Sequence, residues 1–195
     1  SAIALGAQDC APEARGAFTG SVSIEDLRTL GCREVIVGHS ERRQLGEHDV
    51  TIARKLRAAI AAGVYPILCV GETGDERTRG QREMALRRQL DDTVRGLALV
   101  GTQVMRIAYE PVWAIGSGLA ATPDDAAAAH AIIRDCLIEF AGASTAERTR
   151  VLYGGSVDAA NVRTFLARPG IDGVLVGTAS AEIARFRALL TAITA

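Results

Sequence analysis

Residues 104–118 read Val-Met-Arg-Ile-Ala-Tyr-Glu-Pro-Val-Trp-Ala-Ile-Gly-Ser-Gly. The stretch opens as a short apolar run, which ends on the carboxylate Glu110 and continues into a loop that begins with Pro111 and holds the chain's only tryptophan. An apolar run of about 5–7 residues favours a strand over a helix. Because polar residues do not alternate through it, the run is typical of a strand buried on both faces of a parallel sheet.

Five more apolar runs of this kind occur along the chain. The six runs are Ile3–Gln8, Glu34–His39, Tyr65–Gly71, Val104–Glu110, Arg150–Gly154 and Asp172–Gly177. Segments with helical character separate them, so the sequence predicts α/β architecture with parallel strands, either an open doubly wound sheet or a closed (β/α)8 barrel. The length of 195 residues favours the open sheet, since a barrel uses eight strands and about 250 residues.

Periodicity and capping signals predict the helices. Ser23 with Asp26 and Thr122 with Pro123 mark helix starts. The segment 77–97 is interpreted as a surface amphipathic helix. In 47–62 one apolar stripe is expected to contain Val50, Ala53, Leu56 and Ile60.

Composition narrows the classes of function. The net charge of -1 argues against a basic surface that would bind nucleic acid or an anionic membrane. No apolar stretch reaches the length of a transmembrane helix. The four cysteines form no C-x-x-C pair, so we expect no metal site but reduced, mostly buried thiols in a cytoplasmic protein. Lys55 is the only lysine and is interpreted as a solvated helix residue.

Two motifs after predicted strands carry candidate acid–base groups. In Gly38-His39-Ser40-Glu41-Arg42-Arg43, the histidine would face backbone N–H groups that disfavour its protonated form; the alternative is a surface histidine beside a solvated charge run. Glu110 would be partly desolvated under the loop that follows it, which raises the pKa of a carboxylate and makes it a better base. That loop is interpreted as a lid, or alternatively as an ordinary connection.

Two glycine-rich motifs follow the last two predicted strands. They are Tyr153-Gly154-Gly155-Ser156 and Val176-Gly177-Thr178-Ala179-Ser180. Backbone amides in such turns can hold a phosphate dianion, although each motif alone also fits an ordinary turn. Their position matches the phosphate site that barrels build after strands 7 and 8.

These motifs, in this order, resemble the triosephosphate isomerase family. So do A-Q-D-C at 7–10, G-A-F-T-G at 16–20 and C-V-G-E at 69–72. The resemblance covers nearly the whole chain and implies a (β/α)8 TIM barrel that interconverts dihydroxyacetone phosphate and glyceraldehyde 3-phosphate. It implies a small phosphorylated sugar as substrate, a homodimer, and no cofactor.

The resemblance also assigns roles residue by residue. Glu110 matches the family's catalytic base, His39 its electrophile, and Glu41 a carboxylate beside the family's catalytic lysine. Thr19 matches a dimer-loop residue. The implied phosphate-binding residues are Gly116, Ser156, Gly177 and Thr178, and the implied lid comprises Pro111, Val112, Trp113, Ala114, Ile115, Ser117 and Gly118.

The chain also departs from the family pattern. Aligned on the motifs, Ile3–Gln8 is the family's third strand, so residues 1–195 are expected to form one domain that holds strands 3 to 8 and lacks the first two βα units. The family's N-terminal asparagine and lysine are then absent, and Lys55 is not expected to replace that lysine. Three interpretations stay open: a portion of a longer enzyme, a short form completed by another chain, or a non-catalytic scaffold or phosphate binder. Thr178 and Leu119-Ala120 additionally suggest a four-carbon ketose phosphate (erythrulose phosphate) as an alternative substrate.

Overall fold

The computed structural model describes residues 3–101, 103–115 and 121–194. Within them the sheet has six strands: β1 Gly6–Ala7, β2 Glu34–Val37, β3 Tyr65–Val70, β4 Arg106–Tyr109, β5 Arg150–Tyr153 and β6 Gly173–Val174. The helices are α1 Ile24–Thr29, α2 Ser40–Gln44, α3 Asp49–Ala61, α4 Gly74–Thr78, α5 Arg82–Val94, α6 Pro123–Ala141, α7 Ala143–Arg148, α8 Val162–Leu166 and α9 Ile183–Thr194, with 3-10 turns η1 Val112–Ala114 and η2 Thr178–Ser180.

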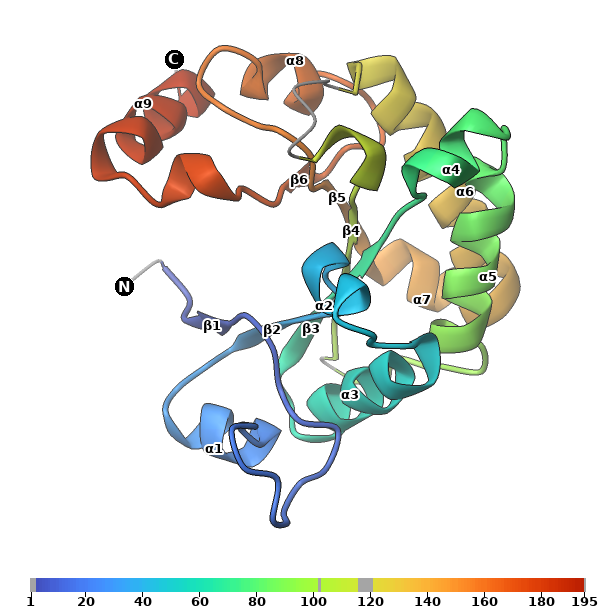
Figure 1. Ribbon diagram of the computed structural model, residues 1–195, viewed down its shortest axis with the longest axis vertical. Helices are drawn as coiled ribbons and strands as arrows, with labels where there is room; N and C mark the ends of the chain where they lie inside the picture. The colour runs from blue at the N-terminus through green and yellow to red at the C-terminus, as the bar shows by residue number, and fades with distance from the viewer. Residues whose placement is uncertain (1–2, 102, 116–120, 195) are drawn as a thin grey trace.

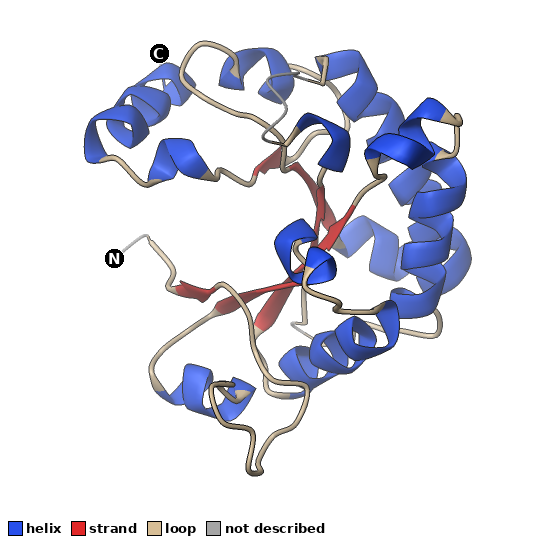
Figure 2. Cartoon of the chain, viewed as in Figure 1, coloured by secondary structure: helices blue, strands red, loops and turns tan. Residues whose placement is uncertain are grey.

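The six strands are parallel and lie in chain order, each paired with the next. Figure 1 shows the row of strands curling, with β1 at one end and β6 at the other, and Figure 2 shows the helices along its outer side. All six predicted strands are therefore confirmed, and the closed-barrel alternative matches the curl of the sheet better than an open doubly wound sheet does.

The central strands β3 and β4 are buried on both faces, as their unbroken apolar character predicts, whereas β1 and β6 at the two ends of the sheet are not. Leu68 and Ile107 pack into the main core together with the outer helices. Ile67 and Ala108 belong to a second, smaller cluster on the opposite face. Because successive side chains of a strand point to opposite faces, a strand enclosed on both sides needs apolar residues at every position.

The predicted helix starts are confirmed at atomic level. The Ser23 side chain accepts a hydrogen bond from the backbone N–H of Asp26 at the start of α1. At the start of α6, Thr122 and Asp125 form a reciprocal capping box, with Pro123 at the first helical position. Both caps satisfy backbone N–H groups that have no partner within the helix.

Two details of the predicted helices are wrong. The segment 77–97 is divided between α4 and α5, because Gly80 takes a φ of +69° and ends the first helix. Val50 is exposed although it was predicted to lie in the apolar stripe of 47–62, and Met84 of the segment 77–97 is exposed as well. Each precedes a buried leucine (Leu56 or Leu90) by six residues, which at 3.6 residues per turn places it about 120° away around the helix.

Lys55 is also placed differently from the prediction. It lies on the expected helix, α3, but its side chain is only 4% exposed. The ammonium pairs with Asp9 at 2.6 Å and with Glu47. A buried ammonium requires such partners. The ion pair with Asp9 therefore joins the segment that follows β1 to α3, and the Lys55 side chain does not face solvent.

No helix of the described residues is long and apolar enough to cross a membrane. The described residues also contain no group of three or more His, Cys, Asp or Glu side chains placed to hold a metal ion.

Candidate active site

Residues that follow four different strands line one cavity of about 440 Å³. They include His39 after β2, Glu110 after β4, Ser156 after β5 and Thr178 after β6. Since parallel strands end at the same rim of the sheet, residues separated by more than a hundred positions in sequence meet there. The rim is therefore the candidate site.

His39 and Glu110 form a direct pair at this rim. Nε2 of His39 lies 2.9 Å from Oε1 of Glu110. The other carboxylate oxygen, Oε2, accepts a hydrogen bond of 2.8 Å from the backbone N–H of Ser40, the first residue of α2. The Glu110 side chain is 3% exposed, against 31% for His39. Glu110 is therefore desolvated, as predicted, and both of its oxygens are engaged.

The hydrogen bonds of His39 define its tautomer. Its Nδ1 accepts from the backbone N–H of Glu41 at 3.3 Å, so the proton of a neutral ring lies on Nε2 and faces Glu110. The backbone donor expected from the sequence is thus present. The hydrogen bond with Glu110 nevertheless raises the pKa of His39 and outweighs the effect of burial. The prediction that the surroundings disfavour the protonated ring is therefore wrong while Glu110 is the direct partner.

Glu41 lines the same cavity, whereas Lys55 does not. Within the described chain no lysine is among the other residues that line the cavity with Glu41, and the chain's one lysine is held by Asp9 and Glu47.

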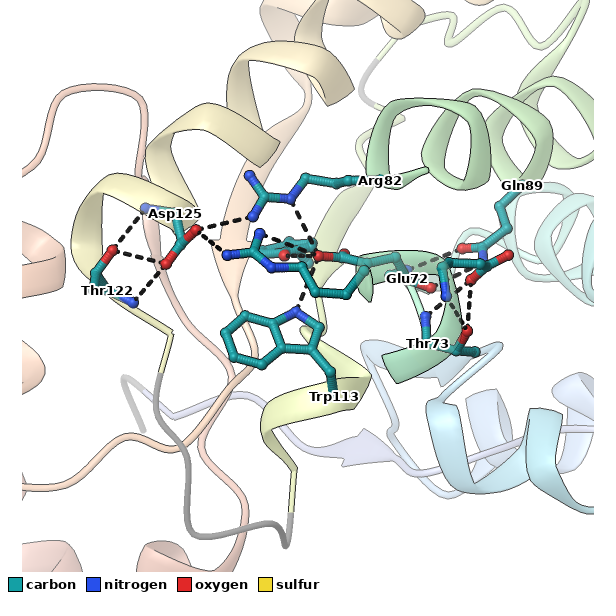
Figure 3. A network of polar contacts seen from close by, with 11 residues as sticks. Glu72, Thr73, Arg82, Gln89, Trp113, Thr122 and Asp125 are labelled. Atoms are coloured by element: carbon teal, nitrogen blue, oxygen red, sulfur yellow. Dashed lines mark hydrogen bonds and ion pairs between the residues drawn. The ribbon is translucent and has the colours of Figure 1, made fainter. Parts of the chain in front are cut away.

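The segment after Glu110 is anchored by a buried carboxylate that the sequence analysis did not single out. Glu72, fully buried just beyond β3, accepts hydrogen bonds at Oε1 from Trp113 Nε1 (3.0 Å), the Tyr109 hydroxyl (3.0 Å) and Arg82 Nε (3.1 Å) (Figure 3). Glu72 follows an apolar run much as Glu110 does, so the same sequence signal could have found it. The indole of Trp113 is thus fixed by its hydrogen bond to Glu72 and is not a freely exposed loop side chain.

The same network reaches the residues beyond the predicted lid. Asp125, in the first turn of α6, pairs with Arg77 at 2.7 Å and with Arg82 at 2.9 Å (Figure 3). Of the predicted lid, the structure describes Pro111, Val112, Trp113, Ala114 and Ile115. The other predicted residues, Gly116, Ser117 and Gly118, lie outside the described residues.

The two glycine-rich loops face the cavity across from His39. Gly155 and Ser156 line it from one loop, and Gly177 and Thr178 from the other. Among the described residues, no hydrogen bond uses the backbone N–H groups of these four. Four such donors around one space can bind a phosphate dianion.

Charge around the cavity is mostly negative. Among the described lining residues, Arg185 of α9 is the one with a fixed positive charge, whereas three carboxylates (Glu41, Glu110 and Asp158) also line the space. Arg185 pairs at 3.1 Å with Glu182, the residue just before α9, and its side chain is 61% exposed. The motifs gave no signal for this residue, because it comes from a helix face and not from a loop after a strand.

Thr19, predicted as a dimer-loop residue, lies outside this cavity. Thr19 is in an exposed loop closed at its base by a hydrogen bond from the Ala11 N–H to the Val22 carbonyl.

A buried carboxylate beside an imidazole at the rim of curled parallel strands, with amide-rich loops opposite, defines an α/β-barrel enzyme with an acid–base site. The model of one protein family, described as triosephosphate isomerase, matches residues 1–193. This chain belongs to the triosephosphate isomerase family, and the predicted fold class and enzyme class are confirmed.

Curated relatives support the assignment. The chain is 50% identical to the triosephosphate isomerase of Chloroflexus aurantiacus over 187 residues, which cover 95% of this chain and 75% of the relative. It is 48% identical to the Thermus thermophilus enzyme over 189 residues (96% and 76%). It is 50% identical to the Roseiflexus sp. enzyme over 185 residues (94% and 73%).

Proposed function

We propose that Glu110 and His39 catalyse the interconversion of dihydroxyacetone phosphate and glyceraldehyde 3-phosphate. The observation that carries this proposal is the 2.9 Å contact between His39 Nε2 and Glu110 Oε1 beside the two glycine-rich loops. Glu110 removes a proton from the carbon next to the substrate carbonyl and returns it to the neighbouring carbon. His39 donates from Nε2 to the oxygens on which negative charge develops.

The raised pKa of His39 is compatible with this role. Its largest cause is the hydrogen bond to Glu110. A substrate carbon that lies against the carboxylate takes the place of the imidazole as its partner and so removes that cause. The contact from Glu41 N–H to Nδ1 keeps the remaining proton on Nε2, where the substrate oxygens need it.

The amides of Gly155, Ser156, Gly177 and Thr178 are assigned to the substrate phosphate, with Gly116 as a further member expected from the family. Residues 111–118 are assigned to a lid that excludes water and retains the phosphate of the reaction intermediate. The anchored Trp113 supports this assignment, because it fixes the first end of that segment.

A coupled assay of triose phosphate turnover tests the proposal. Glu110→Ala is expected to lower kcat by several orders of magnitude, and His39→Gln by a smaller factor. Glu147→Ala, an exposed carboxylate on α7, is the matched control. Turnover by Glu110→Ala at the unmodified rate would exclude the mechanism. A higher kcat/KM for erythrulose phosphate than for dihydroxyacetone phosphate would instead favour the four-carbon alternative.

A phosphate-binding role without turnover is a second candidate, because no lysine lines the cavity within the described chain. Binding of dihydroxyacetone phosphate, measured by 31P NMR, without turnover in the same sample would support it.

The domain, assembly and location are proposed on separate grounds. We assign residues 1–195 to a single barrel domain that contributes six of eight βα units; the 73–76% coverage of the relatives supports this. The exposed loop around Thr19 is assigned to a homodimer contact, which sedimentation over a concentration series tests. The free, buried cysteines support a cytoplasmic location.

A further inference from the structure

The two proposed catalytic residues, His39 and Glu110, follow strands that are not neighbours in the sheet. His39 follows β2 and Glu110 follows β4, and β3 lies between those strands. Their 2.9 Å contact therefore depends on how the end of β3 is fixed to each neighbour. Regular strand pairing stops short of this point, since the last paired residues are Val37 with Leu68 and Val70 with Tyr109.

On the β2 side, one arginine extends the pairing. The residues just beyond the last pair are Gly38 and Cys69, and both of their carbonyls accept hydrogen bonds from Arg43. Nε donates to the Gly38 carbonyl at 2.8 Å, and the guanidinium NH2 group donates to the Cys69 carbonyl at 3.1 Å. Asp49 pairs with the remaining arm at 2.6 Å and so orients the guanidinium. A planar fork can join two carbonyls and a carboxylate in this way, whereas an ammonium is a single point of attachment.

On the β4 side, one glutamine holds the residue that follows β3, and that residue lies against the backbone of Glu110. Gln89 of α5 is buried, accepts from the Gly71 N–H at 2.9 Å and donates to the Gly71 carbonyl at 3.0 Å (Figure 3). Gly71 lies against the backbone of Glu110: a Cβ on Gly71 would be 1.7 Å from the Glu110 carbonyl oxygen. The Glu110 N–H in turn donates to the Val70 carbonyl at 2.8 Å.

We propose that Arg43 and Gln89 are positioning residues that clamp the end of β3 between β2 and β4 and thereby set the separation of His39 and Glu110. Neither residue lines the cavity, so neither touches substrate. The inference deepens the proposed function and rests on it for its catalytic consequence, but the geometric part concerns the two side chains alone.

The geometric part is tested by the titration of His39, followed by imidazole 15N NMR in the full chain. The sequence holds three histidines, so His48 and His130 serve as internal references. The charged groups that act on His39 are Glu110 and Glu41, and the contact with Glu110 raises its pKa. If the clamps set that contact, Arg43→Ala and Gln89→Leu should each lower the pKa of His39 toward its ordinary value.

The direction of this change separates positioning from simple electrostatics. Loss of the Arg43 charge by itself would stabilise a neighbouring cation and raise the pKa of His39, and Gln89→Leu changes no charge. Arg42→Ala, on the same helix but paired with Asp9, and Gln44→Leu, exposed at the end of α2, are the matched controls and should leave the titration unchanged.

Kinetics test the catalytic consequence. A loss of alignment of about 1 Å is expected to lower kcat about 100-fold with KM within a few-fold. Guanidinium added to Arg43→Ala should restore part of kcat. If Arg43→Ala or Gln89→Leu does not fold, as judged by circular dichroism, Arg43→Lys and Gln89→Met replace them, since neither changes the charge at its position.

The outcomes are distinct. Folded clamp variants in which His39 titrates as in the unmodified chain would overturn the inference, whatever their activity. A shifted His39 titration in a chain that turns over no triose phosphate would leave the clamps in place and contradict the proposed function instead.

Discussion

The ammonium nitrogen of Lys55 lies 2.6 Å from Oδ1 of Asp9, and Asp9 also pairs with Arg42 of α2 at 3.1 Å. Asp9 therefore joins the segment after β1 to the two helices that follow β2. The second partner of Lys55, Glu47, has a 6% exposed side chain. The chain's single lysine thus has a structural role, with a measurable consequence.

Lys55→Met is expected to lower the free energy of unfolding by about 3 kcal/mol, since removal of one partner from a buried pair leaves the other charge uncompensated. Urea denaturation measures the change. Arg54→Met, which breaks an exposed pair with Glu13, should cost less than about 1 kcal/mol. Equal costs for the two variants would contradict the assigned role of Lys55.

Glu72→Gln is expected to destabilise the chain by about 2 kcal/mol, because Arg82 then loses its fully buried carboxylate partner and keeps only Asp125, and because Tyr109 and Trp113 lose a charged acceptor. The same change weakens the acceptor for Trp113 Nε1, so the fluorescence of this only tryptophan should report it. Asp75→Asn, at an exposed pair on α4, is the control. An unchanged emission spectrum and unfolding curve would refute the anchoring role of Glu72.

The contribution of His130 to the stability of the chain should fall as the pH drops below about 6.5, the ordinary pKa of histidine. Burial lowers the pKa of His130, although its hydrogen bond to the Gly170 carbonyl opposes this effect. A group whose pKa is lowered on folding contributes stability above its unfolded pKa and loses it as the pH falls toward the folded value. His39 has a raised pKa and contributes in the opposite sense, so its stabilisation is lost as the pH rises through its folded pKa.

Measurement of Tm from pH 5 to pH 7.5 in the unmodified chain and in His130→Asn isolates this effect. The variant should show a weaker loss of Tm at the acidic end. His48→Asn, at an exposed position, should follow the unmodified curve. Parallel curves for the unmodified chain and His130→Asn would exclude His130 as the source.

The thiols should be unreactive in the native chain. All four cysteines are buried, and burial raises the pKa of Cys10 to about 12. Because the thiolate is the reactive form, labelling by Ellman's reagent at pH 8 should be slow until urea unfolds the chain and then report four thiols. Rapid labelling of the native chain would contradict this.

Arg185→Ala is expected to raise the KM for triose phosphate several-fold with a smaller effect on kcat, because Arg185 carries the fixed positive charge of the described cavity lining. Arg187→Ala, exposed on the same helix, is the control. Identical KM values for the two variants would exclude a contribution of Arg185 to phosphate binding.

Much of the fold followed from local patterns. The apolar runs around Val35 and Ile107 predicted strands correctly, because a strand buried on both faces leaves no polar alternation. Thr122 and Ser23 marked helix starts, since a cap is a contact between residues three positions apart. The motifs also gave His39 and Glu110, whose role depends on residue type and on position after a strand.

Local sequence patterns did not predict the contacts between segments that are distant in the chain. The buried state of Lys55 depends on Asp9, 46 positions away, and the acidic partner that makes burial possible is invisible in the helix's own periodicity. The pKa of His39 was misjudged for the same reason: the sequence indicated its backbone neighbours, but the carboxylate that raises its pKa arrives from another strand.

Residue identity and short-range spacing thus suffice for strands, caps, the family and the choice of His39 and Glu110 as the proposed catalytic pair, because those depend on patterns within a few residues. Burial, charge pairing and the alignment of the pair depend on which segments converge at the rim, and only the packed chain determines that. Residues 104–118 illustrate both. Their pattern placed Glu110 at the end of a strand, while Gly71, Gln89 and Ser40, from three other segments, define where its backbone and carboxylate lie.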